Sequence, residues 1–124
     1  MSLAQTIKVY SYSRCSTCRR ALAWLDANNL VYEVVDITKA PPSKEILLLA
    51  FKRLDRRQLL FNTSGQSYRA LGADVVKAMN DDDALAALAA DGRLIKRPFG
   101  ALPSGDVLVG FKPEDWNQES ITRN

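Results

Sequence analysis

Apolar and polar residues alternate close to the start of the chain. Ile7 and Val9 alternate with Lys8 and Tyr10, and the surrounding segment 6–12 is rich in β-branched and aromatic residues. Alternation with a period of two is typical of a strand that buries one face. The pattern therefore predicts a strand over 6–12.

The spacing of apolar residues changes in the next segment. Residues 16–28 place Cys18, Leu22 and Leu25 at helical spacing, and the segment 31–37 returns to the composition of a strand. A strand, a helix and a second strand in this order form a β-α-β unit, in which the strands are parallel and the crossover is right-handed.

The middle of the chain predicts helices. Ser43 is a good N-cap for an apolar helix that reaches about Leu54, and a weaker helix covers about 74–79. Asp81–Asp83 place acidic side chains where the positive end of a helix dipole favours them, and Gly92 suits the position just after that helix.

The last part of the chain returns to strand and turn patterns. We expect an extended segment over 94–102, a turn at 103–106 and a strand at Val107–Val109, which together form a hairpin. Pro113–Trp116 has the composition of a helix start, and the polar residues 118–124 are expected to fray.

The order of these elements indicates an α/β fold with a small mixed sheet. A β-α-β unit, helices, a hairpin and a last helix resemble the order of the thioredoxin fold, here with a helical insertion at about 43–90. A chain of 124 residues is too short for two independent cores, so we expect a single domain over 1–124.

Composition excludes several kinds of catalytic and metal site. The chain has no histidine and 2 cysteines, which excludes Ser–His–Asp triads, Cys–His pairs, histidine-ligated metals and four-thiolate zinc sites. The net charge of +3 permits anionic partners but does not require nucleic acid. Without a membrane span or a signal peptide in the sequence, we expect a cytoplasmic protein whose cysteines are free or redox-active.

The main candidate for chemistry is the C-x-x-C pair of Cys15 and Cys18, between the first strand and the first helix. The free N–H groups and the dipole of a helix N-terminus favour a thiolate at Cys15. Cys18 lies one turn later, within the distance range of a disulfide. This context predicts Cys15 as the nucleophile and Cys18 as the resolving thiol. The alternative is two incidental cysteines, with Cys18 packed in the core.

A second candidate is Arg97, directly before Pro98. In a thioredoxin-type fold the loop before the third strand carries a proline, often cis, beside the nucleophile, so this resemblance predicts a cis Pro98. Arg97 would then lie near Cys15 and offer a bidentate anion site. The alternative is an ordinary turn proline beside a solvated arginine.

Four blocks of the sequence share the order and separations of one family's motifs. They are Ser13–Ala21 with Trp24 and Leu25, Asn62–Gly65 with Tyr68 and Arg69, Leu94–Pro98, and Val109–Phe111. On these blocks the chain resembles the ArsC/Spx/YffB-type family, the arsenate-reductase-like branch of the thioredoxin fold. The resemblance extends over about residues 6–117.

The resemblance implies that Cys15 matches the family's nucleophile and Arg97 its anion-binding arginine. In arsenate reductases of this branch the thiolate attacks arsenate, and glutathione with glutaredoxin completes the reduction. Those enzymes place two further arginines around the oxyanion, at positions that match Phe61 and Gly110 here. We therefore predict an arsenate-reductase-like thiol–disulfide oxidoreductase with Cys15, Cys18 and Arg97 as its site. Glutathione, glutaredoxin or thioredoxin is the expected electron donor, and we expect no bound metal or cofactor.

The C-x-x-C pair also resembles Spx, a redox-controlled regulator that binds RNA polymerase. The alternative prediction is a binding protein in which the Cys15–Cys18 pair is a redox switch. Its expected partner is RNA polymerase, with no direct contact to nucleic acid or to a membrane.

Overall fold

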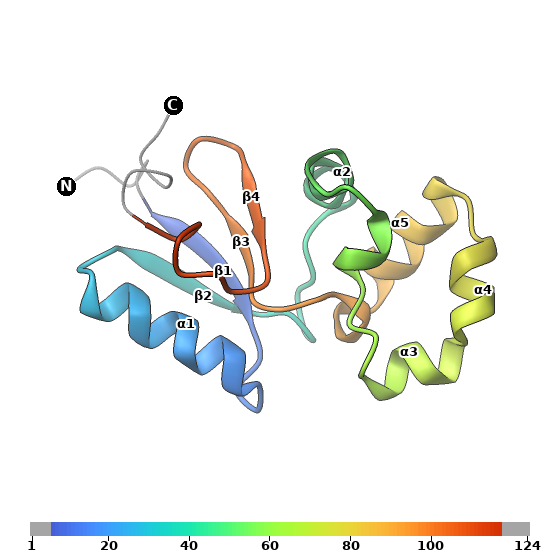
Figure 1. Ribbon diagram of the computed structural model, residues 1–124, viewed down its shortest axis with the longest axis horizontal. Helices are drawn as coiled ribbons and strands as arrows, with labels where there is room; N and C mark the ends of the chain where they lie inside the picture. The colour runs from blue at the N-terminus through green and yellow to red at the C-terminus, as the bar shows by residue number, and fades with distance from the viewer. Residues whose placement is uncertain (1–5, 118–124) are drawn as a thin grey trace. The chain divides into compact units, whose positions relative to one another are not determined.

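The chain divides into two compact units in the computed structural model, which describes residues 6–117 (Figure 1). One unit combines the chain up to Asp36 with the chain from Arg97 onward, and we call it the sheet unit. The other spans Ile37–Lys96, and we call it the helical unit.

The sheet unit contains all the strands that the described residues form. Its strands lie in the order β2-β1-β3-β4, with β1 and β2 parallel and both β1–β3 and β3–β4 antiparallel. The elements are β1 (Ile7–Ser11), α1 (Ser16–Ala27), β2 (Tyr32–Asp36), β3 (Phe99–Ala101) and β4 (Val107–Val109). The predicted β-α-β unit, hairpin and small mixed sheet are confirmed.

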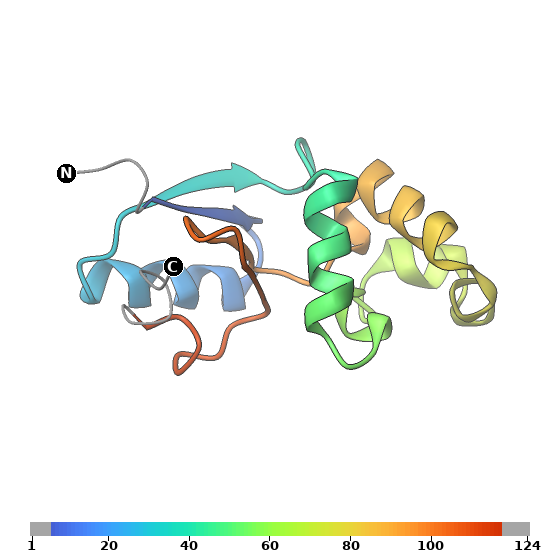
Figure 2. The same cartoon turned by 90° about the horizontal axis from the view of Figure 1, so that it is seen from above.

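Helix α1 runs along one face of this sheet (Figure 2). Ile7 and Val9 of β1 have no exposed surface, and neither does Leu25 of α1, so the alternation seen in the sequence is the alternation of the core. Trp116 completes this core, and its ring lies so close to Gly100 that a Cβ at that position would be 2.8 Å from it. Because glycine has no Cβ, Gly100 leaves room for the indole ring of Trp116 to pack against β3.

The helical unit is built from short helices. Ser43 is the N-cap of the first one, because its hydroxyl accepts the Ile46 N–H at 3.3 Å, as the sequence predicts. Its elements are α2 (Lys44–Arg53), the 3-10 helix η2 (Arg57–Leu60), α3 (Gln66–Leu71), α4 (Ala73–Ala78), α5 (Asp81–Ala90) and the 3-10 helix η3 (Gly92–Leu94).

Helix α5 begins as predicted, but the glycine that follows it, Gly92, has a different role from the predicted one. Asp81–Asp83 form its first turn, and the Asn80 side chain caps it by accepting the Asp83 N–H at 2.8 Å. Gly92 is not in the left-handed region that favours glycine after a helix. Instead, a Cβ at Gly92 would lie 1.7 Å from the Ile37 carbonyl oxygen, so close backbone packing requires the glycine.

Two expectations about secondary structure need correction, and one helix is not predicted by the sequence. Helix α3 was not predicted, because Asn62–Gly65 before it reads as a turn and the helix itself is a short polar segment. In the expected extended segment 94–102, Leu94 ends the 3-10 helix η3, Ile95 is extended and forms a single antiparallel bridge with Phe61, and Phe99–Ala101 form the strand β3.

The predicted helix at Pro113–Trp116 is absent from the described part of the chain, which ends at residue 117. Two successive turns replace it, in which Asp115 N–H donates to Lys112 O and Trp116 N–H to Pro113 O. The buried Trp116 ring anchors them by donating its indole N–H to Gly110 O at 3.0 Å. The prediction that 118–124 fray concerns residues outside the described range.

Candidate functional site

Cys15 lies at the N-terminus of α1, in the loop that follows β1. It is the N-cap residue, with extended backbone, and its Sγ accepts the Cys18 N–H at 3.3 Å. The Cys15 N–H donates to Tyr12 O at 3.0 Å, which closes the loop, and Arg19 N–H donates to Cys15 O at 3.1 Å, which starts the helix. The sulfur therefore sits at the positive end of the helix dipole, as the sequence predicts.

Opposing effects act on the Cys15 thiol, and stabilisation of the thiolate prevails. Burial acts to raise the pKa of Cys15, but hydrogen bonds from the Cys18 thiol and backbone, and then from Arg97, lower this pKa below the ordinary value of 9.0. A lower pKa increases the thiolate fraction at neutral pH, and the thiolate is the nucleophilic form.

Cys18 has the opposite environment. It has no exposed surface, and burial together with the neighbouring Cys15 raises the pKa of Cys18 to about 11, although hydrogen bonds with the Tyr12 backbone and the Ser11 side chain act to lower it. Both cysteines are free thiols in this structure. At neutral pH the loop thus presents one activated sulfur and one protonated sulfur behind it.

Arg97 lies beside Cys15 and precedes Pro98 through a cis peptide bond, as the resemblance to the thioredoxin fold predicts. Its guanidinium provides both a hydrogen bond and a positive charge to the Cys15 sulfur. The guanidinium carbon lies 5.1 Å from the centre of the Tyr12 ring, in a cation–π contact. Within residues 6–117, the buried Arg97 Nε has no hydrogen-bond partner.

The positions that match the two further oxyanion arginines supply no cation. Phe61 is a buried ring of the helical unit, packed edge-on against Tyr68 with ring centres 6.1 Å apart. Gly110 has a positive φ of 74°, which strains any L side chain, and its N–H donates to Pro98 O at 2.9 Å. The backbone geometry at Gly110 therefore disfavours an arginine there.

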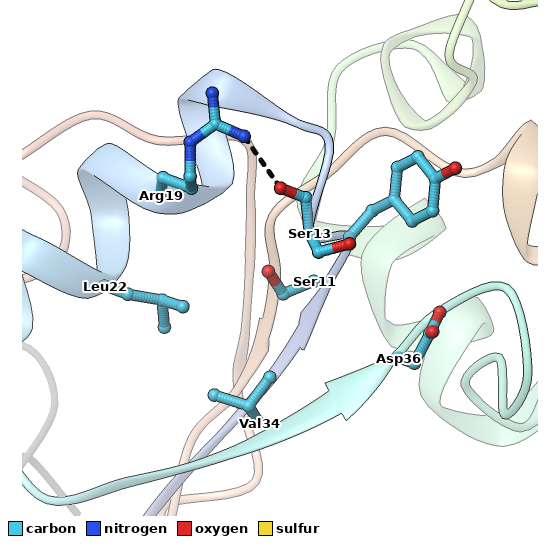
Figure 3. Close-up of a pocket in the computed structure, with 7 residues that line it drawn as sticks. Ser11, Ser13, Arg19, Leu22, Val34 and Asp36 are labelled. Atoms are coloured by element: carbon cyan, nitrogen blue, oxygen red, sulfur yellow. Dashed lines mark hydrogen bonds between the residues drawn. The ribbon is translucent and has the colours of Figure 1, made fainter.

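A cavity of about 330 Å³ opens on the β2 side of the cysteine loop (Figure 3). Leu22 and Val34 form its apolar walls, while Arg19 and Asp36 lie on opposite sides of it (Figure 3). Its lining residues are Ser11, Tyr12, Ser13, Arg19, Leu22, Val34 and Asp36. All seven belong to the sheet unit.

The described part of the chain contains no group of three or more His, Cys, Asp or Glu side chains that could hold a metal ion. In the same residues, no helix is both long enough and apolar enough to cross a membrane.

Sequence reasoning missed Ser11 and Tyr12 as parts of the site. Ser11 is buried and contacts the Cys18 thiol, and Tyr12 supports Arg97 while its backbone contacts both cysteines. The contact between Tyr12 and Arg97 joins segments far apart in the sequence, so only the fold reveals it. Their position just before the C-x-x-C pair is the one signal that the sequence offers.

Comparison with protein families gives a match over most of the chain. The model described as "ArsC family" matches residues 10–118. The uncharacterized protein YusI of Bacillus subtilis is 37% identical over 116 residues, which are 91% of this chain and 97% of YusI.

Two further relatives have named roles. An arsenate reductase of Neisseria meningitidis is 30% identical over 106 residues, covering 84% of this chain and 89% of that protein. The regulatory protein MgsR of Bacillus subtilis is 24% identical over 115 residues, covering 90% of this chain and 87% of MgsR.

Solved structures share the fold. The crystal structure of a possible arsenate reductase from Streptococcus mutans superimposes with a TM-score of 0.78 at 40% identity, covering 86% of this chain and 91% of that one.

Proposed function

Because the chain belongs to the ArsC family and has its thioredoxin-like fold, we propose that it is a thiol-dependent reductase. In this proposal Cys15 is the nucleophile, Cys18 is the resolving thiol and Arg97 binds the anionic part of the substrate. The observation that carries it is the Cys15 sulfur at the N-terminus of α1, with a pKa lowered by Cys18 and Arg97 although burial opposes this.

The first step is attack by the Cys15 thiolate on one sulfur of a disulfide. A bond forms between the Cys15 sulfur and that sulfur, the substrate's S–S bond breaks, and the other sulfur leaves as a thiolate that takes a proton from water. The helix N-terminus and Arg97 hold Cys15 in the charged form that this step needs.

The second step is release of the mixed disulfide by Cys18. Its pKa of about 11, set by burial and by Cys15, keeps it protonated until the first step has removed the negative charge on Cys15. Cys18 then gives its proton to water and attacks the Cys15 sulfur; the Cys15–Cys18 bond forms, the mixed disulfide breaks, and the second substrate sulfur leaves as a thiolate that takes a proton from water. Two electrons have then passed from the protein to the substrate.

A disulfide fits the charges of this site better than arsenate does. Arg97 is the cation beside Cys15, and Phe61 and Gly110 stand where arsenate reductases have two more arginines. Each missing charge-assisted hydrogen bond costs about 1.5–3 kcal/mol of oxyanion binding. A single bidentate arginine suits the carboxylate of glutathione or of a peptide.

We propose glutathione, with glutaredoxin, or thioredoxin as the donor that reduces the Cys15–Cys18 disulfide again. These are the thiol donors of the cytoplasm, where two free cysteines in a small protein are ordinarily kept reduced. The protein's own chemistry requires no further cofactor, because each step is a thiol–disulfide exchange.

The test is turnover coupled to NADPH consumption, with arsenate and hydroxyethyl disulfide as alternative substrates and each donor system in turn. We expect disulfide turnover that Cys15→Ser abolishes and Arg97→Ala weakens. Arg20→Ala is the matched control. This substitution also removes a positive charge from the N-terminal part of α1, but the Arg20 side chain donates its hydrogen bond to the Thr17 hydroxyl. Arsenate turnover that depends on Cys15 and Arg97 would replace the disulfide as the proposed substrate.

A redox-switched regulator is the second candidate, supported by the similarity to the regulatory protein MgsR. In this reading the Cys15–Cys18 disulfide changes the affinity for RNA polymerase, and no substrate turns over. Pull-down of polymerase from a cell extract by the reduced and the oxidised protein tests it. Enrichment in one redox state supports the switch, whereas equal absence in both states contradicts it.

A further inference from the structure

The cavity beside β2 is not explained by the reaction at Cys15 and Arg97. Arg97 and Pro98 precede β3, whereas the cavity lies toward β2, on the other side of β1 in the strand order. It is nevertheless continuous with the cysteine loop, since Ser11, Tyr12 and Ser13 line it and Arg19 belongs to the first turns of α1.

The walls of the cavity are apolar side chains that the fold leaves uncovered. Val34 lies on the strand β2 and is 50% exposed, although it points toward α1 and Leu22 (Figure 3). Helix α1 directs Cys18, Ala21 and Leu25 into the core. An exposed valine facing a leucine across an open space loses dispersion contacts that an apolar ligand group can restore.

The size and charge of the cavity select among ligands. About 330 Å³ lies at the lower end of the range of roughly 300–1,000 Å³ for small-molecule sites, so it suits one or two amino-acid side chains. Arg19 is the cation at its edge, with one N–H donating to Ser13 O at 2.7 Å, and the Asp36 carboxylate lies on the opposite side. A carboxylate and an apolar wall disfavour an oxyanion such as arsenate.

These features are complementary to a polypeptide. An apolar side chain fills the space between Leu22 and Val34, and the opposite charges of Arg19 and Asp36 at the edge match polar backbone or side-chain groups of either sign. The cavity also lies at the carboxyl ends of the parallel strands β1 and β2, where Ser11 is paired in register with Asp36. Tyr12 and Ser13 line the cavity, and Tyr12 O accepts the Cys15 N–H at 3.0 Å, so the cavity adjoins the loop that holds the nucleophile.

We propose that this cavity is a specificity site for a peptide disulfide, and that it takes an apolar side chain adjacent to the cysteine that Cys15 attacks. The inference rests on the proposed function and names its substrate class. The exchange itself is unchanged: the Cys15 thiolate forms a bond to the peptide's sulfur, the S–S bond breaks, and the departing peptide thiolate takes a proton from water. The bound apolar group raises the rate by holding the disulfide near Cys15.

The test compares two symmetric disulfides, of acetyl-Cys-Leu-amide and acetyl-Cys-Gly-amide, on the Cys18→Ser background. The mixed disulfide with Cys15 accumulates there, and intact mass gives its rate of formation. We expect the leucine peptide to react about tenfold faster or more than the glycine peptide, as is typical when a hydrophobic pocket accepts an extra apolar group. Equal rates for the two peptides would overturn the proposal.

Substitutions that fill the cavity test whether the leucine side chain of the peptide binds there. Val34→Trp is expected to bring the ratio of the leucine and glycine rates close to one, and Val34→Phe is a milder second variant, with circular dichroism to check that each folds. Val31→Trp is the matched control, because Val31 is 38% exposed but does not line the cavity, and it should keep the ratio. A ratio that survives both Val34 variants would contradict the assignment.

A binding measurement separates this inference from the proposed function. Methyl NMR spectra of the reduced protein are titrated with acetyl-Ser-Leu-amide, which cannot exchange disulfides, and with acetyl-Ser-Gly-amide. Saturable shifts of the Leu22 and Val34 methyl signals with the leucine peptide alone support the cavity even if no disulfide, including hydroxyethyl disulfide, reacts with Cys15. Absence of shifts while hydroxyethyl disulfide reacts would refute the cavity and leave the reductase in place.

Discussion

Cys15 and Cys18 lie one helical turn apart, yet their surroundings act on them in opposite directions. At Cys15, hydrogen bonds from Cys18 and Arg97 overcome the effect of burial and lower the thiol pKa. At Cys18, burial and the neighbouring Cys15 raise the thiol pKa to about 11. The comparison shows that the two thiols of a C-x-x-C pair acquire different pKa values because Cys15 lies at the N-terminus of the helix and Cys18 lies in the core.

The largest expected effect is the loss of the activated sulfur. Cys15→Ser should abolish disulfide turnover, by at least about three orders of magnitude, because a serine hydroxyl is not ionised near neutral pH and cannot form a disulfide. NADPH-coupled turnover measures this, with circular dichroism to show that the variant folds. Full turnover by Cys15→Ser would move the chemistry to another residue.

Loss of the second sulfur should interrupt the reaction at a later point. Cys18→Ser is expected to keep the first attack, to accumulate a mixed disulfide at Cys15, and to reduce steady turnover about tenfold or more. Intact mass before and after treatment with a reductant detects the adduct. If Cys18→Ser turns over as fast as the native protein, without an adduct, then an external thiol performs the release instead.

Removal of the Arg97 side chain should bring the pKa of Cys15 closer to the pKa of Cys18. Arg97→Ala removes a hydrogen bond and a positive charge from the Cys15 thiolate, so the pKa of Cys15 should rise. Reactivity is lost as the pH falls through this pKa, and the alkylation profile should therefore move to higher pH. We expect a rate at pH 7 lower by about three- to tenfold, measured with iodoacetamide.

Arg97→Lys is the informative partner of that variant. Lysine keeps the charge but not the planar fork, so its profile should lie between those of the native protein and Arg97→Ala. A profile that does not move in either variant would show that the helix N-terminus alone activates Cys15.

The raised pKa of Cys18 should also appear in stability. Folding favours the protonated thiol when its pKa is about 11 in the native state against 9.0 for an unperturbed thiol, so this contribution is present below about pH 9 and is lost as the pH rises toward 11. The native protein should lose about 1–3 kcal/mol more unfolding free energy than Cys18→Ala between pH 8 and 10.5. Urea unfolding at both pH values measures the difference. Equal losses for the two proteins would show that folding does not raise the pKa of Cys18.

The smallest effect concerns the hydroxyl behind Cys18. Ser11 forms a side-chain hydrogen bond with Cys18 that acts to lower its pKa, so Ser11→Ala should slow release of the mixed disulfide by about two- to fourfold. Single-turnover kinetics separates the two steps, and the rate of the first attack should not change. An equal slowing of both steps would indicate a general disturbance of the loop.

The sequence predicted much of the sheet unit because its signals are local. Alternation at Ile7 and Val9 and helical spacing at Cys18 and Leu25 mark side chains that are buried in the structure, and the predicted turn precedes the strand β4 at Val107. The C-x-x-C context placed Cys15 at a helix N-terminus, and the resemblance placed Arg97 before a cis proline.

Other features depend on contacts between distant segments, which spacing does not encode. Tyr12 under Arg97, Val34 facing the cavity and the close approach that requires Gly92 all appear only in the folded chain. The prediction of a helix at Pro113 was wrong for the same reason. The Trp116 ring packs against Gly100 and donates a hydrogen bond to Gly110 O, and these distant contacts override a favourable helix start.

The most direct test of the two-cysteine account is the ionisation of both thiols in the native protein. Alkylation with iodoacetamide is quenched at a series of pH values, and peptide mass spectrometry reports modification at Cys15 and at Cys18 separately. The account predicts a midpoint for Cys15 below that of an ordinary thiol and a midpoint for Cys18 well above it. A shared midpoint, or a lower one at Cys18, would contradict the assignment of nucleophile and resolving thiol.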